Sequence, residues 1–241
     1  MAKRVVFFVY GCACYVVFLG TFLYAIGFIG GFGVPTRLDD PATSPLGEAV
    51  LINAGLLGLF AVQHSVMARK WFKDRWTKLV PRPVERSTYT LLSSLALILM
   101  FWQWRPMGME IWTVTNSAGR AALYAGFAFG WMLVLVSTFL INHFDLFGLR
   151  QVWLALMGRP YVALGFATPG PYRMVRHPLY VGWFFAFWMT PAMTAAHLLF
   201  AVATTAYILI AIQFEEHDMV REFPQYADYR RRVPMIVPGT K

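Results

Sequence analysis

The stretch at residues 168–180 reads TPGPYRMVRHPLY, and this polar, proline-rich, basic segment precedes two apolar runs. The first run covers residues 180–190 and is interrupted by the sequence TPAMT, and the second covers residues 195–214. An upright membrane-crossing helix needs about 20 apolar residues, and the first run is shorter than that. The two runs therefore predict a helical hairpin with its tip at Pro191.

The two ends of such a hairpin lie on the same side of the membrane. Arg176, His177 and Tyr180 begin the hairpin, and the acidic pair Glu215 and Glu216 ends it. We therefore expect these side chains to lie close together in space. Adjacent carboxylates at a membrane boundary are costly unless cations pair with them. The cluster predicts either a site for a cationic ligand or an ion-paired helix end that only stabilises the fold.

The composition of the whole chain indicates a membrane protein. Of the 241 residues, 58% are hydrophobic and only 14% are charged, which is too little polar surface for a soluble domain of this length. We predict an all-α polytopic membrane helical bundle with four spans, a C-terminal helical hairpin and a cytoplasmic catalytic face. The four spans are expected at residues 5–32, 48–67, 87–104 and 118–141. The chain is read as one domain (1–241), with N-terminal spans in 5–141 and the hairpin and motif region in 142–241.

The distribution of basic residues predicts the orientation of the spans. With the N-terminus inside, all of the 21 Lys and Arg residues except Arg37, Arg105 and Arg120 fall on the cytoplasmic side. Positively charged residues favour the cytoplasmic side of a membrane, so both termini are expected there. The net charge of +9 is therefore attributed to membrane orientation and to anionic membrane lipids, and nucleic acid is excluded as a partner.

The two cysteines, Cys12 and Cys14, lie in the first apolar run and are separated by one residue. This spacing disfavours a disulfide between them, and two ligands are too few for a metal site. We expect both thiols to pack in the interior, and we expect no metal.

Two histidines near predicted membrane boundaries are candidates for a catalytic base. His64 lies in QHSVMARKW at the end of the second span, where it is either functional or an interfacial residue bonded to a neighbouring helix. His143 and Asp145 lie in NHFDLFGLRQVW (142–153), which has the pattern of an amphipathic segment at the membrane surface. The same segment contains Gln151.

Aromatic residues follow the acidic pair. Phe223, Tyr226 and Tyr229 are three residues apart, so on a continuous helix they would share one face. Such a face can stack on a purine or contact a cation, or it can anchor the chain at the membrane interface. The basic loop at 69–86 is read as an orientation signal, with an anionic substrate cradle as the alternative.

The sequence RHPLYVG at 176–182, followed by EEHDMVREFPQYADYRRRVPMIVP at 215–238, resembles the signature of the membrane methyltransferases typified by isoprenylcysteine carboxyl methyltransferase and phospholipid methyltransferase. The signature covers about the last third of the chain. Met219 and Pro224 stand where the family often has Leu and Gly. The segments QHSVMARKW and NHFDLFGLRQVW are similar to the bacterial branch related to NnrU-type proteins, and within it to enzymes that methylate methanethiol to dimethyl sulfide.

The resemblance implies a bacterial inner-membrane enzyme with S-adenosylmethionine as methyl donor and a small thiol as acceptor. It places the cofactor against the hairpin ends and nearby polar residues, namely Tyr172, Arg176, His177, Tyr180, Glu215, Glu216 and Gln151. His143, oriented by Asp145, is the expected base for the thiol, with His64 in reserve. The alternatives are a prenylcysteine carboxylate or lipid amine as acceptor, or a non-enzymatic NnrU-like membrane protein or transporter.

Overall fold

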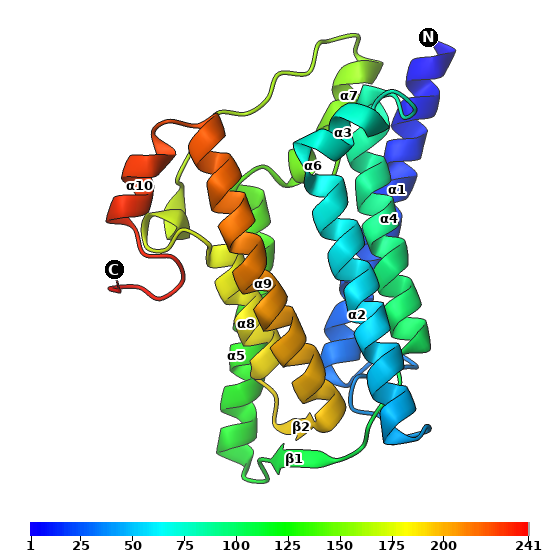
Figure 1. Cartoon of the computed structure of the whole chain (residues 1–241), viewed down its shortest axis with the longest axis vertical. Helices are drawn as coiled ribbons and strands as arrows, with labels where there is room; N and C mark the ends of the chain where they lie inside the picture. The colour runs from blue at the N-terminus through cyan, green and yellow to red at the C-terminus, as the bar shows by residue number, and fades with distance from the viewer. Residues whose placement is uncertain (241) are drawn as a thin grey trace. The chain divides into compact units, whose positions relative to one another are not determined.

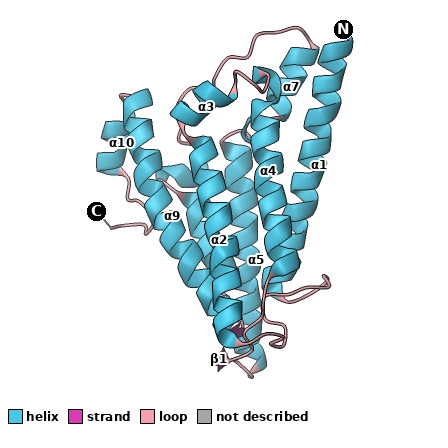
Figure 2. Cartoon of the chain, turned by 45° about the vertical axis from the view of Figure 1, so that its right-hand side comes forward, coloured by secondary structure: helices cyan, strands magenta, loops and turns pink. Residues whose placement is uncertain are grey.

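The structure is a computed structural model that describes residues 1–240, and its elements gather into two compact units. The first unit comprises Met1–Gly108 and Asn142–Ala163, and the second comprises Met109–Ile141 and the chain from Leu164 onward. Helices make up most of each unit (Figure 2), which confirms the predicted all-α fold class.

The first unit is built on long helices connected by short ones. Its elements are α1 (Ala2–Gly30), α2 (Leu46–Ala68), α3 (Lys70–Trp76), α4 (Arg82–Gln103), α6 (His143–Leu146) and α7 (Leu149–Leu156). Helix α4 packs against both α1 and α2, and α7 packs against α1 and α4. Helix α7 can approach α1 closely because Gly11 faces it: a Cβ atom at Gly11 would lie 2.6 Å from Cγ2 of Val152.

The second unit contains the hairpin (Figure 1). Its elements are β1 (Glu110–Thr113), α5 (Ser117–Leu140), the 3₁₀ turn η1 (Gly170–Arg173), α8 (Pro178–Trp188), β2 (Ala192–Thr194), α9 (Ala195–Glu222) and α10 (Tyr226–Arg232). Helices α8 and α9 form the two legs, and the chain turns between them at residues 189–194. Strands β1 and β2 pair antiparallel beside this turn, at the opposite end of α9 from α10.

Four helices of the described chain are long and apolar enough to cross a membrane, and they are α1, α2, α5 and α9. The predicted third span corresponds to α4, which is not among these four. One face of α4 carries hydroxyl groups, and Ser87, Thr90, Ser93 and Ser94 are buried. These side chains lower the apolar character of α4.

The clustering of helices differs from the sequence division at residue 142. Helix α5 packs with α8 of the hairpin, whereas residues 142–163 pack with α1 and α4. The contact between α5 and α8 depends on two glycines. A Cβ atom at Gly130 would lie 2.6 Å from the backbone nitrogen of Ala186, and a Cβ atom at Gly182 would lie 2.8 Å from the carbonyl oxygen of Gly130. Small residues at such crossings allow close helix packing in lipid.

We expect Gly130→Ala to destabilise the protein, because the added methyl group meets the backbone of α8 and cannot be accommodated by a side-chain rotation. Overpacking of this kind costs about 1–3 kcal/mol. Thermal unfolding in detergent would measure the loss. Gly58→Ala is the matched control, since a Cβ atom at Gly58 in α2 would meet nothing within 4 Å. Equal unfolding temperatures for the two variants would contradict the assignment of Gly130 to a tight crossing.

Candidate functional site

The carboxylate of Glu216 lies at the centre of a buried ion-pair cluster in the second unit. Its residue is only 2% exposed. Arg176 donates from Nε to Oε1 at 2.6 Å, and Nε2 of His177 lies 3.0 Å from the same oxygen. Nε of Arg230 forms an ion pair with Oε2 at 3.0 Å. Two cationic side chains and a histidine thus compensate a single carboxylate, which a buried charge requires.

The backbone around Arg176 and His177 is held by the C-terminal segment. Proline at position 178, the first residue of α8, starts the helix without needing an N–H partner, so the two preceding residues remain outside it. Their N–H groups donate to the carbonyls of Pro234 and Met235, at 2.9 and 3.2 Å. Nη1 of Arg176 also donates to the carbonyl oxygen of Arg230 at 3.0 Å. Arg176 therefore connects the C-terminal segment to the start of the hairpin, just before α8.

Glu215 is adjacent in sequence but has a different environment. It is exposed, and its Oε2 accepts a hydrogen bond from the hydroxyl of Tyr180 at 2.9 Å. A hydroxyl group does not neutralise a carboxylate. The structure thus brings together all five predicted residues at the hairpin ends, but it separates the acidic pair into a buried, ion-paired Glu216 and an exposed Glu215.

An aromatic cluster lies close to the ion pairs. The ring of Phe166 contacts the rings of Phe223, Tyr226 and Tyr229, with centroids 5.9, 5.5 and 5.3 Å apart. The three residues do not share one continuous helix, because α9 ends at Glu222 and α10 begins at Tyr226. Phe223 is extended, as is usual before a proline, and Pro224 follows it. The cluster instead converges on Phe166.

The tyrosines of this region remain protonated at physiological pH. Burial raises the pKa of Tyr229 to about 12. Burial also raises the pKa of Tyr172 and of Tyr226, and the negative charge of Glu215 acts on both in the same direction. The Tyr229 hydroxyl donates to the carbonyl oxygen of Tyr172, which ties α10 to the 3₁₀ turn before α8. These phenols can donate hydrogen bonds, but they are unsuited to act as bases.

His143 lies in the first unit, where it is 4% exposed. Its Nε2 forms a hydrogen bond with the hydroxyl of Tyr15 in α1, at 2.8 Å. Its ring also contacts Phe144 and Phe147, with centroids 5.5 and 4.8 Å apart. Burial lowers the pKa of His143 below its ordinary value, so the imidazole is neutral at pH 7 and can accept a proton.

The sequence predicted that Asp145 orients His143, but the Asp145 side chain bonds to other residues. Its Oδ1 accepts from Arg150 at 2.8 Å, and its Oδ2 accepts from the hydroxyl of Tyr161 at 3.2 Å. The side chain of Gln151 donates to the backbone carbonyl of Asp145 at 3.0 Å. In this structure Asp145 and Gln151 stabilise the loop between α6 and α7 and the chain that follows α7.

His64 lies within α2 and is surrounded by hydroxyl groups. Its Nδ1 is 3.2 Å from Oγ of Ser93, and its Nε2 is 3.0 Å from the hydroxyl of Tyr89. Phe60 stacks on its ring, with centroids 5.1 Å apart. Both of its nitrogens have partners on α4, an arrangement that fits the interfacial alternative considered from the sequence.

Three contributors to these sites were not predicted from the sequence. Arg230 lies in an RRR run that reads as an orientation signal, Tyr15 lies within an apolar span, and Phe166 lies in a connecting segment. Only the aromatic character of Phe166 and Tyr15 could have drawn attention to them. Within residues 1–240, no three His, Cys, Asp or Glu side chains gather in an arrangement that could hold a metal ion.

The fold and this site define a helical membrane protein with a charged site at the open end of its hairpin. The chain is 58% identical to a methanethiol S-methyltransferase of Crocosphaera subtropica, over 98% of this chain and 93% of that protein. It is 56% identical to a methanethiol S-methyltransferase of Mycobacterium tuberculosis, over 98% and 97% of the two chains. The chain therefore belongs to the methanethiol S-methyltransferase family.

A more distant similarity links the chain to nurim of Bos taurus, at 27% identity over 80% of this chain and 78% of that protein. No family model and no solved structure matches the chain. The resemblance to membrane methyltransferases, which rested on the last third of the sequence, is confirmed over nearly the full length.

We expect Glu216→Gln to destabilise the second unit, because it leaves the cations of Arg176 and Arg230 without their buried carboxylate. Breaking a buried ion pair costs about 3–5 kcal/mol. The measurements are thermal unfolding in detergent and the rate of proteolysis of the segment after α10. Glu215→Gln is the matched control, and its exposed position predicts a change within about 0.5 kcal/mol. Similar stability of the two variants would show that the cluster is not structural.

Proposed function

We propose that this protein is an S-adenosylmethionine-dependent methyltransferase that converts methanethiol to dimethyl sulfide. The observation that carries the proposal is the family membership, in which relatives at 58% and 56% identity are named methanethiol S-methyltransferase. The site in the second unit supports it, because the exposed carboxylate of Glu215 is close enough to the aromatic cluster to act electrostatically on Tyr226.

The residues at the hairpin ends fit a cofactor that carries positive charge and a purine ring. Glu215 is exposed, so its carboxylate can attract a sulfonium or ammonium group, and Tyr180 orients it. The half-buried rings of Phe166 and Phe223 offer faces on which adenine can stack. We assign Glu216, together with Arg176 and His177, to the positioning of this surface, because the three side chains bond to one another. Tyr172 also contributes to the positioning of this surface, because its backbone carbonyl accepts a hydrogen bond from the hydroxyl of Tyr229.

The methyl donor supplies an electrophilic methyl group on a positively charged sulfur. The acceptor thiol loses its proton, its sulfur forms a bond to the methyl carbon, and the bond from that carbon to the donor sulfur breaks. The products are dimethyl sulfide, S-adenosylhomocysteine and a proton. The protein's tasks are to align the two sulfurs, to exclude water and to accept the proton.

We propose His143 as the group that accepts the proton. A thiol of ordinary pKa is mostly protonated at pH 7, and the thiolate is the nucleophile. The lowered pKa of His143 keeps its imidazole neutral, and Tyr15 fixes the orientation of the ring. Asp145 stabilises the loop around His143 through its ion pair with Arg150. His64 is the second candidate for the base, because both of its ring nitrogens already have hydroxyl partners.

We propose a location in the bacterial inner membrane with both termini in the cytoplasm, based on the distribution of Lys and Arg. Reporter domains inserted within residues 106–116 and fused after residue 240 are then expected on opposite sides of the membrane. Both reporters on one side would contradict the hairpin topology.

The test of the function is methyl transfer by purified protein with labelled S-adenosylmethionine, with dimethyl sulfide measured in the headspace. A prenylcysteine and a lipid amine are offered in parallel, and faster turnover of either would contradict the choice of acceptor. We expect Glu215→Gln to weaken cofactor binding by about tenfold to a hundredfold, the value of a charge-assisted hydrogen bond. Glu222→Gln, at an exposed carboxylate in the same helix, is expected to bind normally. Normal binding by Glu215→Gln would remove that residue from the site.

The test of the base is the pH dependence of methyl transfer. In the wild-type protein we expect the rate to fall only at a pH below the ordinary histidine range, because burial lowers the pKa of His143 and a protonated His143 cannot accept a proton. His143→Ala is expected to lower the rate by about 10²–10⁴-fold and to make it rise steadily with pH, since the thiolate must then come from solution. Tyr15→Phe should retain the acid limb of the profile at a lower rate. A wild-type profile in His143→Ala would exclude this histidine as the base.

A further inference from the structure

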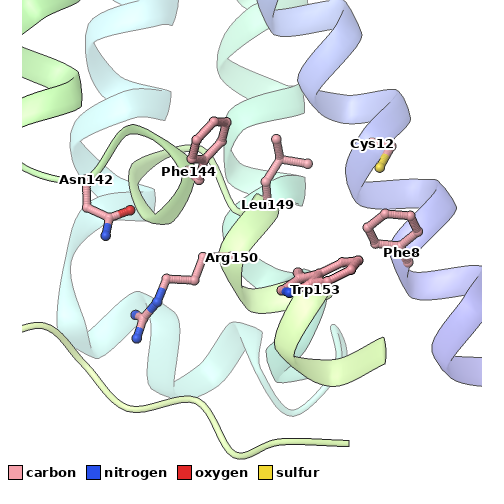
Figure 3. Close-up of a pocket in the computed structure, with 7 residues that line it drawn as sticks. All are labelled: Phe8, Cys12, Asn142, Phe144, Leu149, Arg150 and Trp153. Carbon is pink, nitrogen blue, oxygen red and sulfur yellow. The ribbon is translucent and has the colours of Figure 1, made fainter. Parts of the chain in front are cut away.

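An open groove of about 480 Å³ lies in the first unit, between α1 and the segment formed by α6 and α7 (Figure 3). Phe8 and Cys12 line it from α1, Leu149 and Trp153 line it from α7, and Phe144 lines it from α6. All five side chains are apolar or only weakly polar. The proposed base, His143, lies between the lining residues Asn142 and Phe144 and its ring contacts Phe144, but the function proposed above assigns no role to the groove itself.

The size and position of the groove favour a hydrocarbon chain over a small thiol. A water molecule occupies about 30 Å³, so the groove has room for many times the volume of a thiol with two heavy atoms. It runs along α1, which is long and apolar enough to cross a membrane. Phe144 and Trp153 are 50% and 51% exposed, and burying each methylene group against such a surface is favourable by about 0.8 kcal/mol.

One end of the groove is polar. Asn142 and Arg150 lie there, and Figure 3 shows the Arg150 side chain directed away from the apolar wall. Both hydrogen bonds of Arg150, to Asp145 and to the carbonyl oxygen of Val162, use Nη1. Its Nη2 and Nε groups are therefore not used by those two bonds.

Further cations lie at the start of α1 and after the end of α7, the two helices that border the groove. Lys3, Arg4 and Arg159 are exposed. The start of α1 lies beside the end of α7, because a Cβ atom at Gly158 would lie 2.6 Å from Nη1 of Arg4. Asp145 is the only acidic residue within 1–12 and 142–163, and it already accepts hydrogen bonds from Arg150 and Tyr161. The charge around the groove is thus positive and complements an anionic headgroup.

We propose that this groove binds one anionic phospholipid, with an acyl chain between α1 and α7 and its phosphate against Arg150 and the exposed cations. Each cation near a membrane surface contributes about fivefold to the binding of an anionic lipid. The inference does not rest on the proposed reaction, because none of its observations involves the cofactor surface of the second unit or the proton acceptor His143.

Native mass spectrometry of the purified full chain tests the proposal, with phosphatidylglycerol and phosphatidylcholine of identical chains added at equal concentration. We expect preferential retention of phosphatidylglycerol, and a loss of about fivefold per removed charge in Arg4→Gln/Arg159→Gln. Lys78→Gln/Arg82→Gln removes two exposed cations elsewhere in the same unit and should leave the preference unchanged. Equal retention of the two lipids, or an equal effect of the control, would overturn the proposal.

The two cysteines allow a second arm that tests the groove itself. Cys12 lines the groove, whereas Cys14 is 2% exposed. The Cys14→Ala variant therefore carries a single thiol, which lies in the groove. A bulky maleimide on Cys12 should abolish retention of phosphatidylglycerol, and bound lipid should slow the labelling. Undiminished retention by the labelled protein would place the lipid elsewhere. A gain of a methyl group by the retained lipid, when S-adenosylmethionine is supplied, would make the groove an acceptor site and overturn its role as a lipid-binding site.

Discussion

The carboxylate of Glu216 is the constraint on which the arrangement of the second unit depends. A charge that is 2% exposed must be compensated by nearby cations, and the compensating groups come from two separate parts of the chain. Arg176 and His177 precede α8, and Arg230 belongs to α10. The single carboxylate therefore links the start of the hairpin, its end and the segment that follows. The surface next to it, with Glu215 and the aromatic cluster, is held in place by this linkage.

The division of labour between the two adjacent glutamates follows from helix geometry. Neighbouring positions on a helix point about 100° apart, so one side chain can be directed into the packed interior while the next is exposed. Glu216 faces Arg176, which precedes α8, and Arg230 in α10, whereas Glu215 reaches the hydroxyl of Tyr180. A motif that contains two identical residues thus supplies a structural group and a group available to a ligand.

Much of the fold could be predicted from hydropathy and from the positions of the turn-forming prolines alone. The hairpin turn beside Pro191 and the proximity of Arg176 to Glu216 follow from the lengths of two apolar runs. The contribution of Arg230 could not be predicted, because it depends on a reversal of the chain after α9. Pro224 causes that reversal by holding Phe223 in an extended conformation, whereas the sequence alone suggested a single aromatic helix face. The partner of His143 was also missed, since Tyr15 lies in a span that reads as lipid-facing, and hydropathy carries no information on which helices are neighbours.

The pairing of the hairpin with residues 230–235 bears on the order in which the protein matures during synthesis. A nascent chain that has reached residue 222 already contains α1, α2, α5 and α9, the four helices of the described residues that are long and apolar enough to cross the bilayer. Its buried carboxylate nevertheless has no Arg230, and the N–H groups of Arg176 and His177 have no carbonyls from Pro234 and Met235. Translation that stops in this interval would yield a product that resembles the mature protein in membrane association but lacks the linkage that completes the site. Insertion into the membrane and completion of the site are therefore separate events in biosynthesis.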